Sequence, residues 1–146
     1  MWMLLTCLVA HALLADLMAL PWWVPNLTVA GLVLAVVRSP QRWLALSALA
    51  GLFTILPAAR LSAQMFASYL ALGWVVKSIS AQWDASDPRV LYLLAAAACM
   101  GMTLYAVWLD GLWLWPILGW ALAHTALTIL TVPIIQRLSL LSEQSQ

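Results

Sequence analysis

Three ionisable side chains lie within the apolar stretches of this sequence: His11, Asp16 and His124. Ionisable groups are costly inside a membrane, so such residues are candidates for a functional site. The two histidines lie near the middle of their stretches, and two imidazoles at one depth are the minimum set for a b-type haem or a chlorophyll. Histidines hydrogen-bonded to neighbouring hydroxyl or carbonyl groups are more common in helix bundles, and we expect that arrangement, with no cofactor and no metal.

Asp16 lies four residues before the end of the first apolar stretch, where its carboxylate could face Arg60. One interpretation is a proton or substrate site. The favoured interpretation is an interhelical hydrogen bond, or a carboxylate that reaches the membrane interface. The sequence has no Ser-His-Asp spacing, no HExxH, no paired intramembrane carboxylates, no GxGxxG and no Walker motif. These absences predict a protein that is not an enzyme.

The amino-acid composition indicates which kind of secondary structure positions these residues. Of the 146 residues, 66% are hydrophobic and 8% are charged, against about 25% charged in a typical soluble domain. The mean hydropathy is +1.00. The core of a globular protein of this size is too small to bury so much apolar surface, so the composition excludes a soluble globular protein. The high hydrophobic content also excludes a disordered chain. The net charge of +1, with no basic block, excludes nucleic acid as a partner.

We therefore predict an all-α, polytopic membrane protein with the lipid bilayer as its surroundings. Proline, glycine and charged residues divide the chain into six apolar stretches that form one compact transmembrane bundle over residues 1–137, followed by a short polar C-terminal tail at 138–146. A five-span alternative, with residues 43–76 partly re-entrant, stays open. Asp87 and Pro88 are expected to begin the fifth helix, as its N-cap and first residue. The six stretches are 2–20, 22–37, 43–59, 61–76, 90–109 and 113–135.

Charge placement predicts the topology. With six spans, the basic residues divide five to one between the two sides of the membrane, and the positive-inside rule assigns the richer side to the cytoplasm. Both termini are then cytoplasmic. The richer side carries Arg38, Arg42, Lys77, Arg89 and Arg137, and the other side carries Arg60.

The run Pro25-Asn26-Leu27 at the start of a short span, followed by an Arg-containing turn, resembles the rod shape-determining protein MreD family. Members are small six-span proteins with a P-[ND]-L start to the second span, a glycine-bearing third span and a fourth span rich in Ala, Leu and Tyr. The corresponding third span here contains Gly51, and the fourth contains Ser68-Tyr69-Leu70. Ile55 stands where the family has Asp, and Ala63 where it has Gly.

The resemblance implies a non-enzymatic scaffold subunit of the bacterial cell-elongation complex, which makes peptidoglycan. Such a protein lies in the inner membrane and packs against a single-span, MreC-like periplasmic partner and other membrane subunits. Its sites would be helix faces. The partner-interface candidates are Trp22, Trp23, Pro25, Asn26, Asp16 and Arg60.

Two other functions stay open. The family is distantly similar to the substrate-binding subunits of energy-coupling-factor vitamin transporters, and Ala15 and Ala19 form the kind of Ala-xxx-Ala pair that those subunits use. A transport subunit needs an outward pocket with polar groups. A small subunit of a redox or photosynthetic complex, with His11 and His124 as ligands, is the third hypothesis.

Overall fold

The structure, a computed structural model, describes residues 2–18, 24–55, 63–83, 87–111 and 115–144. The described residues form six α-helices and one short 3-10 helix, so the predicted all-α class is confirmed. In chain order the elements are α1 (Trp2–Leu17), α2 (Leu27–Arg38), η2 (Pro40–Arg42), α3 (Trp43–Ile55), α4 (Ala63–Ser80), α5 (Pro88–Leu109) and α6 (Trp115–Gln144).

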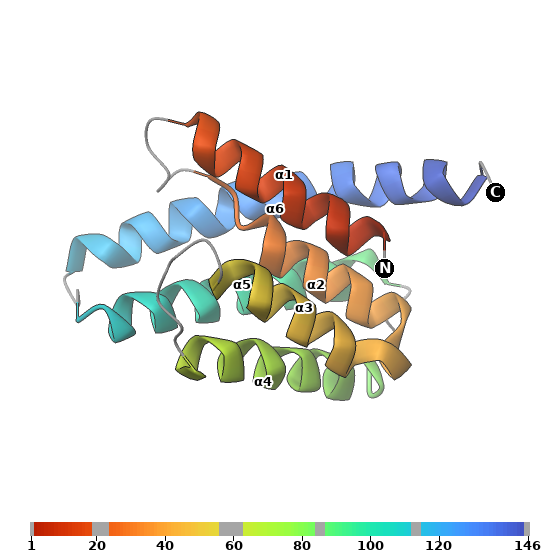
Figure 1. The fold of residues 1–146 in the computed structure, drawn as a ribbon, viewed down its shortest axis with the longest axis horizontal. Helices are drawn as coiled ribbons and strands as arrows, with labels where there is room; N and C mark the ends of the chain where they lie inside the picture. Colours follow the sequence, from red (N-terminus) through yellow and green to blue (C-terminus); the bar gives the residue numbers. More distant parts are fainter. Residues whose placement is uncertain (1, 19–23, 56–62, 84–86, 112–114, 145–146) are drawn as a thin grey trace.

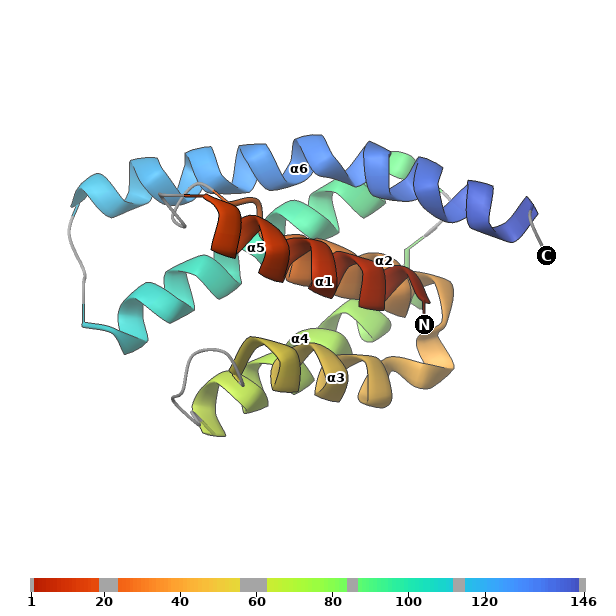
Figure 2. The same cartoon turned by 45° about the horizontal axis from the view of Figure 1, so that its top comes forward.

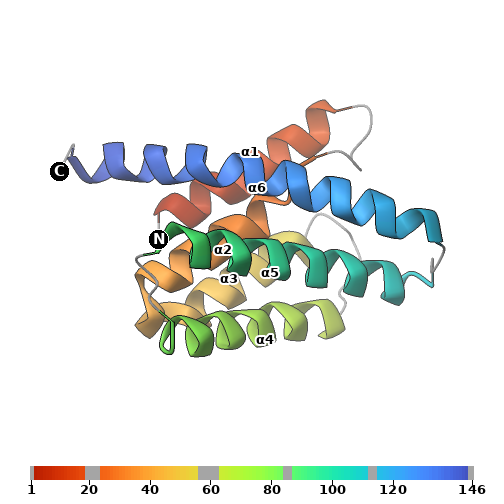
Figure 3. The same cartoon turned by 180° about the vertical axis from the view of Figure 1, so that it is seen from behind.

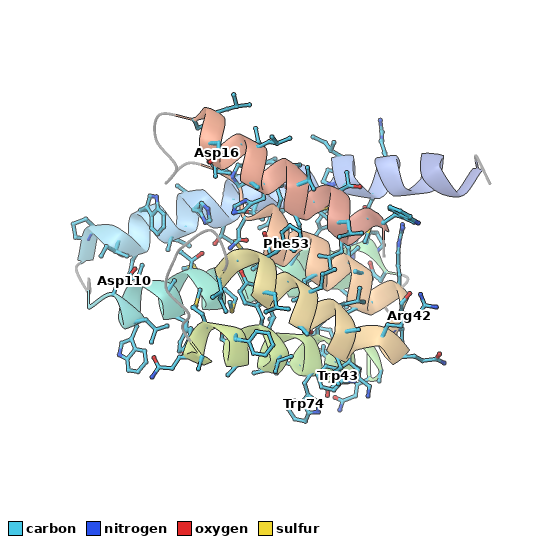
Figure 4. All side chains as sticks on the ribbon, in the orientation of Figure 1. Asp16, Arg42, Trp43, Phe53, Trp74 and Asp110 are labelled. Atoms are coloured by element: carbon cyan, nitrogen blue, oxygen red, sulfur yellow. The ribbon has the colours of Figure 1, made fainter. Side chains whose placement is uncertain are left out.

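The six helices run up and down the bundle in alternation. In Figure 1 the start of α1, the turn from α2 into α3, the turn from α4 into α5 and the end of α6 all lie on the right. Figure 3 shows the same ends together from behind. We call this the basic end, because the helix ends and turns there carry Arg38, Arg42, Lys77 and Arg89. Asp16 and Asp110 lie at the opposite, acidic end, as Figure 4 shows.

Helix α2 is the centre of the bundle. Its residues from Leu27 to Val36 are all buried, and it contacts each of the other five helices. Figure 2 shows α2 behind α1, with α3, α4, α5 and α6 around the pair. A helix that is apolar on every side has no face for solvent, so it is stable only when other helices surround it.

Helices α3 and α4 form the closest pair. A Cβ on Gly73 would overlap the Oγ of Ser47, and a Cβ on Gly51 would lie 2.9 Å from the Phe66 ring. At the basic end, the Lys77 ammonium lies 5.5 Å from the centroid of the Trp43 ring. Small residues at 47, 51 and 73 therefore let the two backbones approach, as small-xxx-small pairs do in membrane bundles.

Several helix boundaries differ from the predicted spans. Helix α2 begins at Leu27, not at residue 22, because Val24–Asn26 is irregular backbone. Helix α4 continues to Ser80, four residues beyond the predicted end. Helix α6 runs on to Gln144, so the predicted polar tail is largely a helical extension. The predicted N-cap of α5 is confirmed, since the Asp87 carboxylate accepts from the Arg89 N–H at 2.8 Å.

Two of the helices are long and apolar enough to cross a membrane, over Pro88–Leu109 and Pro116–Arg137. Helices α1 and α2 are apolar but shorter. The 12 residues of α2 rise about 18 Å, against roughly 30 Å for the hydrocarbon layer.

We expect Gly73→Ala to destabilise the protein by about 1–3 kcal/mol, because the new methyl group overlaps Ser47 and the two helices must separate. Thermal unfolding in detergent measures the loss. Gly101→Ala is the matched control, since nothing lies within 4 Å of its Cβ position, and its midpoint should stay within a degree or two of the wild type. Adding Ser47→Ala to Gly73→Ala should restore part of the loss. A Gly73→Ala protein as stable as the wild type would contradict the close approach.

Candidate functional site

The polar groups of the interior converge on the irregular segment Val24–Asn26, which leads into α2. Val24 is only 2% exposed, so its backbone has no access to solvent. Non-helical backbone at membrane depth is tolerated only where other protein groups satisfy its hydrogen bonds. Helices α1 and α6 supply those groups. We call this segment, together with His11, Thr103, His124 and Thr128, the polar junction.

His124 of α6 is bonded through both ring nitrogens. Its Nε2 lies 2.8 Å from the carbonyl oxygen of Val24, and its Nδ1 lies 3.4 Å from the Thr103 hydroxyl of α5. A carbonyl can only accept, so Nε2 carries the proton and donates, and Nδ1 accepts from Thr103. The Trp120 ring stacks on the imidazole, with centroids 5.3 Å apart. His124 therefore connects α5, α6 and the start of α2.

His11 of α1 makes the second bond to the segment. Its Nδ1 lies 3.1 Å from the carbonyl oxygen of Pro25, to which it must donate. Its other nitrogen, Nε2, is then an acceptor and makes no hydrogen bond to a described residue. The two histidines thus occupy opposite tautomers. The expectation that carbonyl groups satisfy them is confirmed for both side chains.

The Thr128 hydroxyl is the third connection. It donates to the carbonyl of His124 at 2.9 Å within α6. Its oxygen accepts from the backbone N–H of Asn26 at 2.9 Å and from the Cys99 thiol at 3.5 Å. One hydroxyl therefore joins α5, α6 and the segment before α2.

Asn26 begins α2. Its side-chain oxygen accepts from the Val29 N–H at 3.1 Å, as an N-cap does, and its carbonyl accepts from the Ala30 N–H. The Pro25-Asn26-Leu27 run is therefore the place where irregular backbone becomes the central helix. No described buried side-chain nitrogen or oxygen lacks a hydrogen-bond partner.

A cavity of about 600 Å³ opens beside the polar junction, at the acidic end. We call it the end cavity. It is bounded by side chains from α1, α3, α4, α5 and α6 and by the segment before α2, and its volume is in the range of small-molecule sites. Its polar and aromatic lining consists of His11, Asn26, Thr54, Tyr69, Thr103, Asp110, Trp120 and His124.

A groove of about 440 Å³ lies between α1 and α6. We call it the α1–α6 groove. Its lining is apolar apart from two threonine hydroxyls, and those hydroxyls are bonded to carbonyls of their own helices. Its lining residues come from α1, from the start of α2 and from α6: Trp2, Met3, Thr6, Cys7, Ala10, Leu14, Pro25, Leu27, Thr131, Ile134 and Ile135.

The predicted partner-interface residues differ in their burial and in whether the structure describes them. Pro25 and Asn26 are half-buried, and their polar groups are engaged within the chain. Asp16 is exposed at the acidic end (Figure 4). Trp22, Trp23 and Arg60 lie outside the described residues, so the pairing of Asp16 with Arg60 stays a prediction, as does the partner interface.

The described residues contain no group of three or more His, Cys, Asp or Glu side chains able to hold a metal ion. A bis-histidine cofactor would need a free nitrogen on each ring, and both nitrogens of His124 are already bonded. The hydrogen bonds of the polar junction hold the backbone of Val24–Asn26 in place.

The residues that sequence reasoning missed are Thr103, Trp120 and Thr128. One signal was available: Trp120, His124 and Thr128 are spaced by four residues and so share a face of α6. Thr103 has no such signal, because only the packing of α5 on α6 brings it to the ring.

In comparison with known proteins, no family model, no curated protein and no solved structure matches this chain.

We expect Thr128→Val to destabilise the protein by about 1–3 kcal/mol, because it leaves the Asn26 N–H in the interior without an acceptor. Thermal unfolding in detergent reports the change. Thr131→Val is the control on the same helix, since the Thr131 hydroxyl donates only to the Thr128 carbonyl of its own helix, at 2.6 Å, and its loss should cost under about 0.5 kcal/mol. Equal effects of the two substitutions would show that the bond to Asn26 contributes nothing.

Proposed function

We propose that this chain is a non-enzymatic scaffold subunit of the bacterial inner membrane that packs against a single-span partner, as its resemblance to the MreD family implies. The observation that carries the proposal is the α1–α6 groove. The side chains of His11, His124 and Thr128 are engaged in holding the start of α2, and the proposed partner binds to helix faces.

Few side chains of helix α1 are buried against the rest of the bundle. It contributes three buried residues, Leu4, Cys7 and Leu8, whereas α2 contributes ten. Its apolar side chains at the acidic end are exposed, with Leu17 at 81%. A helix so poorly buried within the bundle has most of its surface available for lipid or for another helix.

The dimensions and chemistry of the groove favour one apolar helix as occupant. From Trp2 to Leu14 it follows α1 for about 18 Å, which is more than three turns of a helix lying alongside. Small side chains line it at Thr6, Cys7 and Ala10, and small residues let a second backbone approach closely in a membrane. No charged residue lines the groove, so the occupant needs no charge at that depth.

The proposal includes a six-span topology with both termini in the cytoplasm. The basic end of the bundle collects the cationic helix ends and turns, and the positive-inside rule assigns that end to the cytoplasm (Figure 1). The short helix α2 is continued toward the other side by Val24–Asn26, whose backbone is satisfied within the protein. In the elongation complex, the single-span partner would then connect this subunit to the wall-synthesis enzymes.

We expect a photo-reactive aliphatic diazirine placed at Leu14, in the groove, to cross-link in living cells to a protein with one apolar span. The same side chain at Leu93 is the control, because Leu93 is exposed on α5 and lies outside the groove lining. Mass spectrometry of the adducts identifies the occupant. Adducts with lipid alone at both positions, or with a multi-span protein at Leu14, would overturn the proposal.

Filling the groove provides a second measurement. Ala10→Phe should reduce the Leu14 adduct at least tenfold, because the added ring occupies the space of the partner helix. Ala71→Phe adds the same ring on the exposed face of α4 and should leave the adduct unchanged. An adduct that survives Ala10→Phe places the partner elsewhere.

The topology is tested separately with reporter fusions. A green fluorescent protein fused after Gln146 should fluoresce, because it folds in the cytoplasm, and alkaline phosphatase inserted after Gly111 should be active, because it needs the periplasm. Alkaline phosphatase inserted after Gln82 should be inactive. With the N-terminus still in the cytoplasm, the five-span alternative reverses the results at all three sites, because the span that it lacks lies before residue 82.

A further inference from the structure

The end cavity is not used by the scaffold proposal. It shares no lining residue with the α1–α6 groove. We propose that the end cavity is a binding site for a small planar nitrogen heteroaromatic molecule that donates hydrogen bonds and carries no negative charge.

The charge of the lining determines which ligands are excluded. Among the described residues that line the cavity, none is Lys or Arg, and the one carboxylate is that of Asp110, exposed at the turn after α5 (Figure 4). An anion would meet this carboxylate. A neutral or cationic molecule meets no such penalty, because opposite charges attract and like charges repel most strongly where little water screens them.

The hydrogen-bonding groups determine which end of the ligand is recognised. His11 lines the cavity and donates through Nδ1 to Pro25, so its Nε2 is an acceptor. The Asp110 carboxylate is also an acceptor. His124, by contrast, has both nitrogens engaged. The cavity therefore offers the acceptors of His11 and Asp110 beside the amide and hydroxyl groups of Asn26, Thr54 and Tyr69. An amine or amide N–H is the group that complements the two acceptors.

Flat and soft side chains favour an aromatic ring as the body of the ligand. The stacked pair of Trp120 and His124 lines the cavity, and Met65 and Met102 line it as well. Aromatic rings stack on such surfaces, and thioethers adapt their shape to a ring edge. The acidic end also faces the periplasm in the proposed topology, so a ligand would enter from outside the cell.

Three probes that share one aromatic ring separate the effect of charge from that of hydrogen-bond donation. Nicotinamide is neutral and 1-methylnicotinamide is cationic, and both have an amide N–H that donates a hydrogen bond. Nicotinate is anionic and has no hydrogen-bond donor. We expect saturation-transfer NMR with the full chain in detergent to show binding of the first two at millimolar concentration, and at least fivefold weaker binding of nicotinate. Ala106→Phe, which places a ring in the cavity, should abolish the signals. Ala97→Phe adds the same ring on an exposed face of α5 and should preserve them.

Asp110→Asn tests the charge of the cavity lining without changing a buried residue, because Asp110 is exposed. It should lower the affinity for 1-methylnicotinamide relative to nicotinamide at least threefold, because it removes a negative charge from the lining. Equal binding of all three probes, or signals that persist in Ala106→Phe with an unchanged unfolding midpoint, would overturn the site. Absence of binding by nicotinamide and 1-methylnicotinamide would also overturn it, while the scaffold proposal would stand, since its groove shares no residue with the cavity.

Discussion

The structure depends on one requirement: irregular backbone buried at the start of the central helix must have its hydrogen bonds satisfied. Helix α2 is surrounded on every side, and the segment before it is buried at Val24 and half-buried at Pro25 and Asn26, so the carbonyls of Val24 and Pro25 and the N–H of Asn26 need partners within the protein. His11, His124 and Thr128 satisfy these three groups. Because those side chains come from α1 and α6, the first and last helices of the chain are held at one end of α2.

This requirement explains why polar side chains are present at all in so apolar a chain. Only 8% of the residues are charged, and the two histidines serve the backbone at the start of α2. The end cavity is lined by His11 and His124 and by Val24 and Asn26 of the irregular segment. The residues that satisfy the buried backbone therefore also line the proposed ligand site.

The rest of the packing relies on small residues, and their positions were only partly predictable. Ser47 and Gly51 lie on α3 against α4, as a small-xxx-small pair should. The pairs Ala67/Ala71 and Ala97/Gly101 have the same spacing, but they lie on exposed or loosely covered surface. Sequence spacing shows that two residues share a helix face. It does not show which face meets a neighbour.

Composition and punctuation by themselves determined the all-α class, the number of helices, the N-cap at Asp87 and the side on which the basic residues gather. These features are local, or they follow from the order of apolar stretches along the chain. Only the tertiary structure decided that α2 is central, that it begins at Leu27, and that its start is bonded to Thr128, which is 102 residues from Asn26. The physical reason is that apolar stretches of similar composition have no individual signal for their neighbours. Which helix is enclosed, and which polar group meets which carbonyl, depends on how all six pack together.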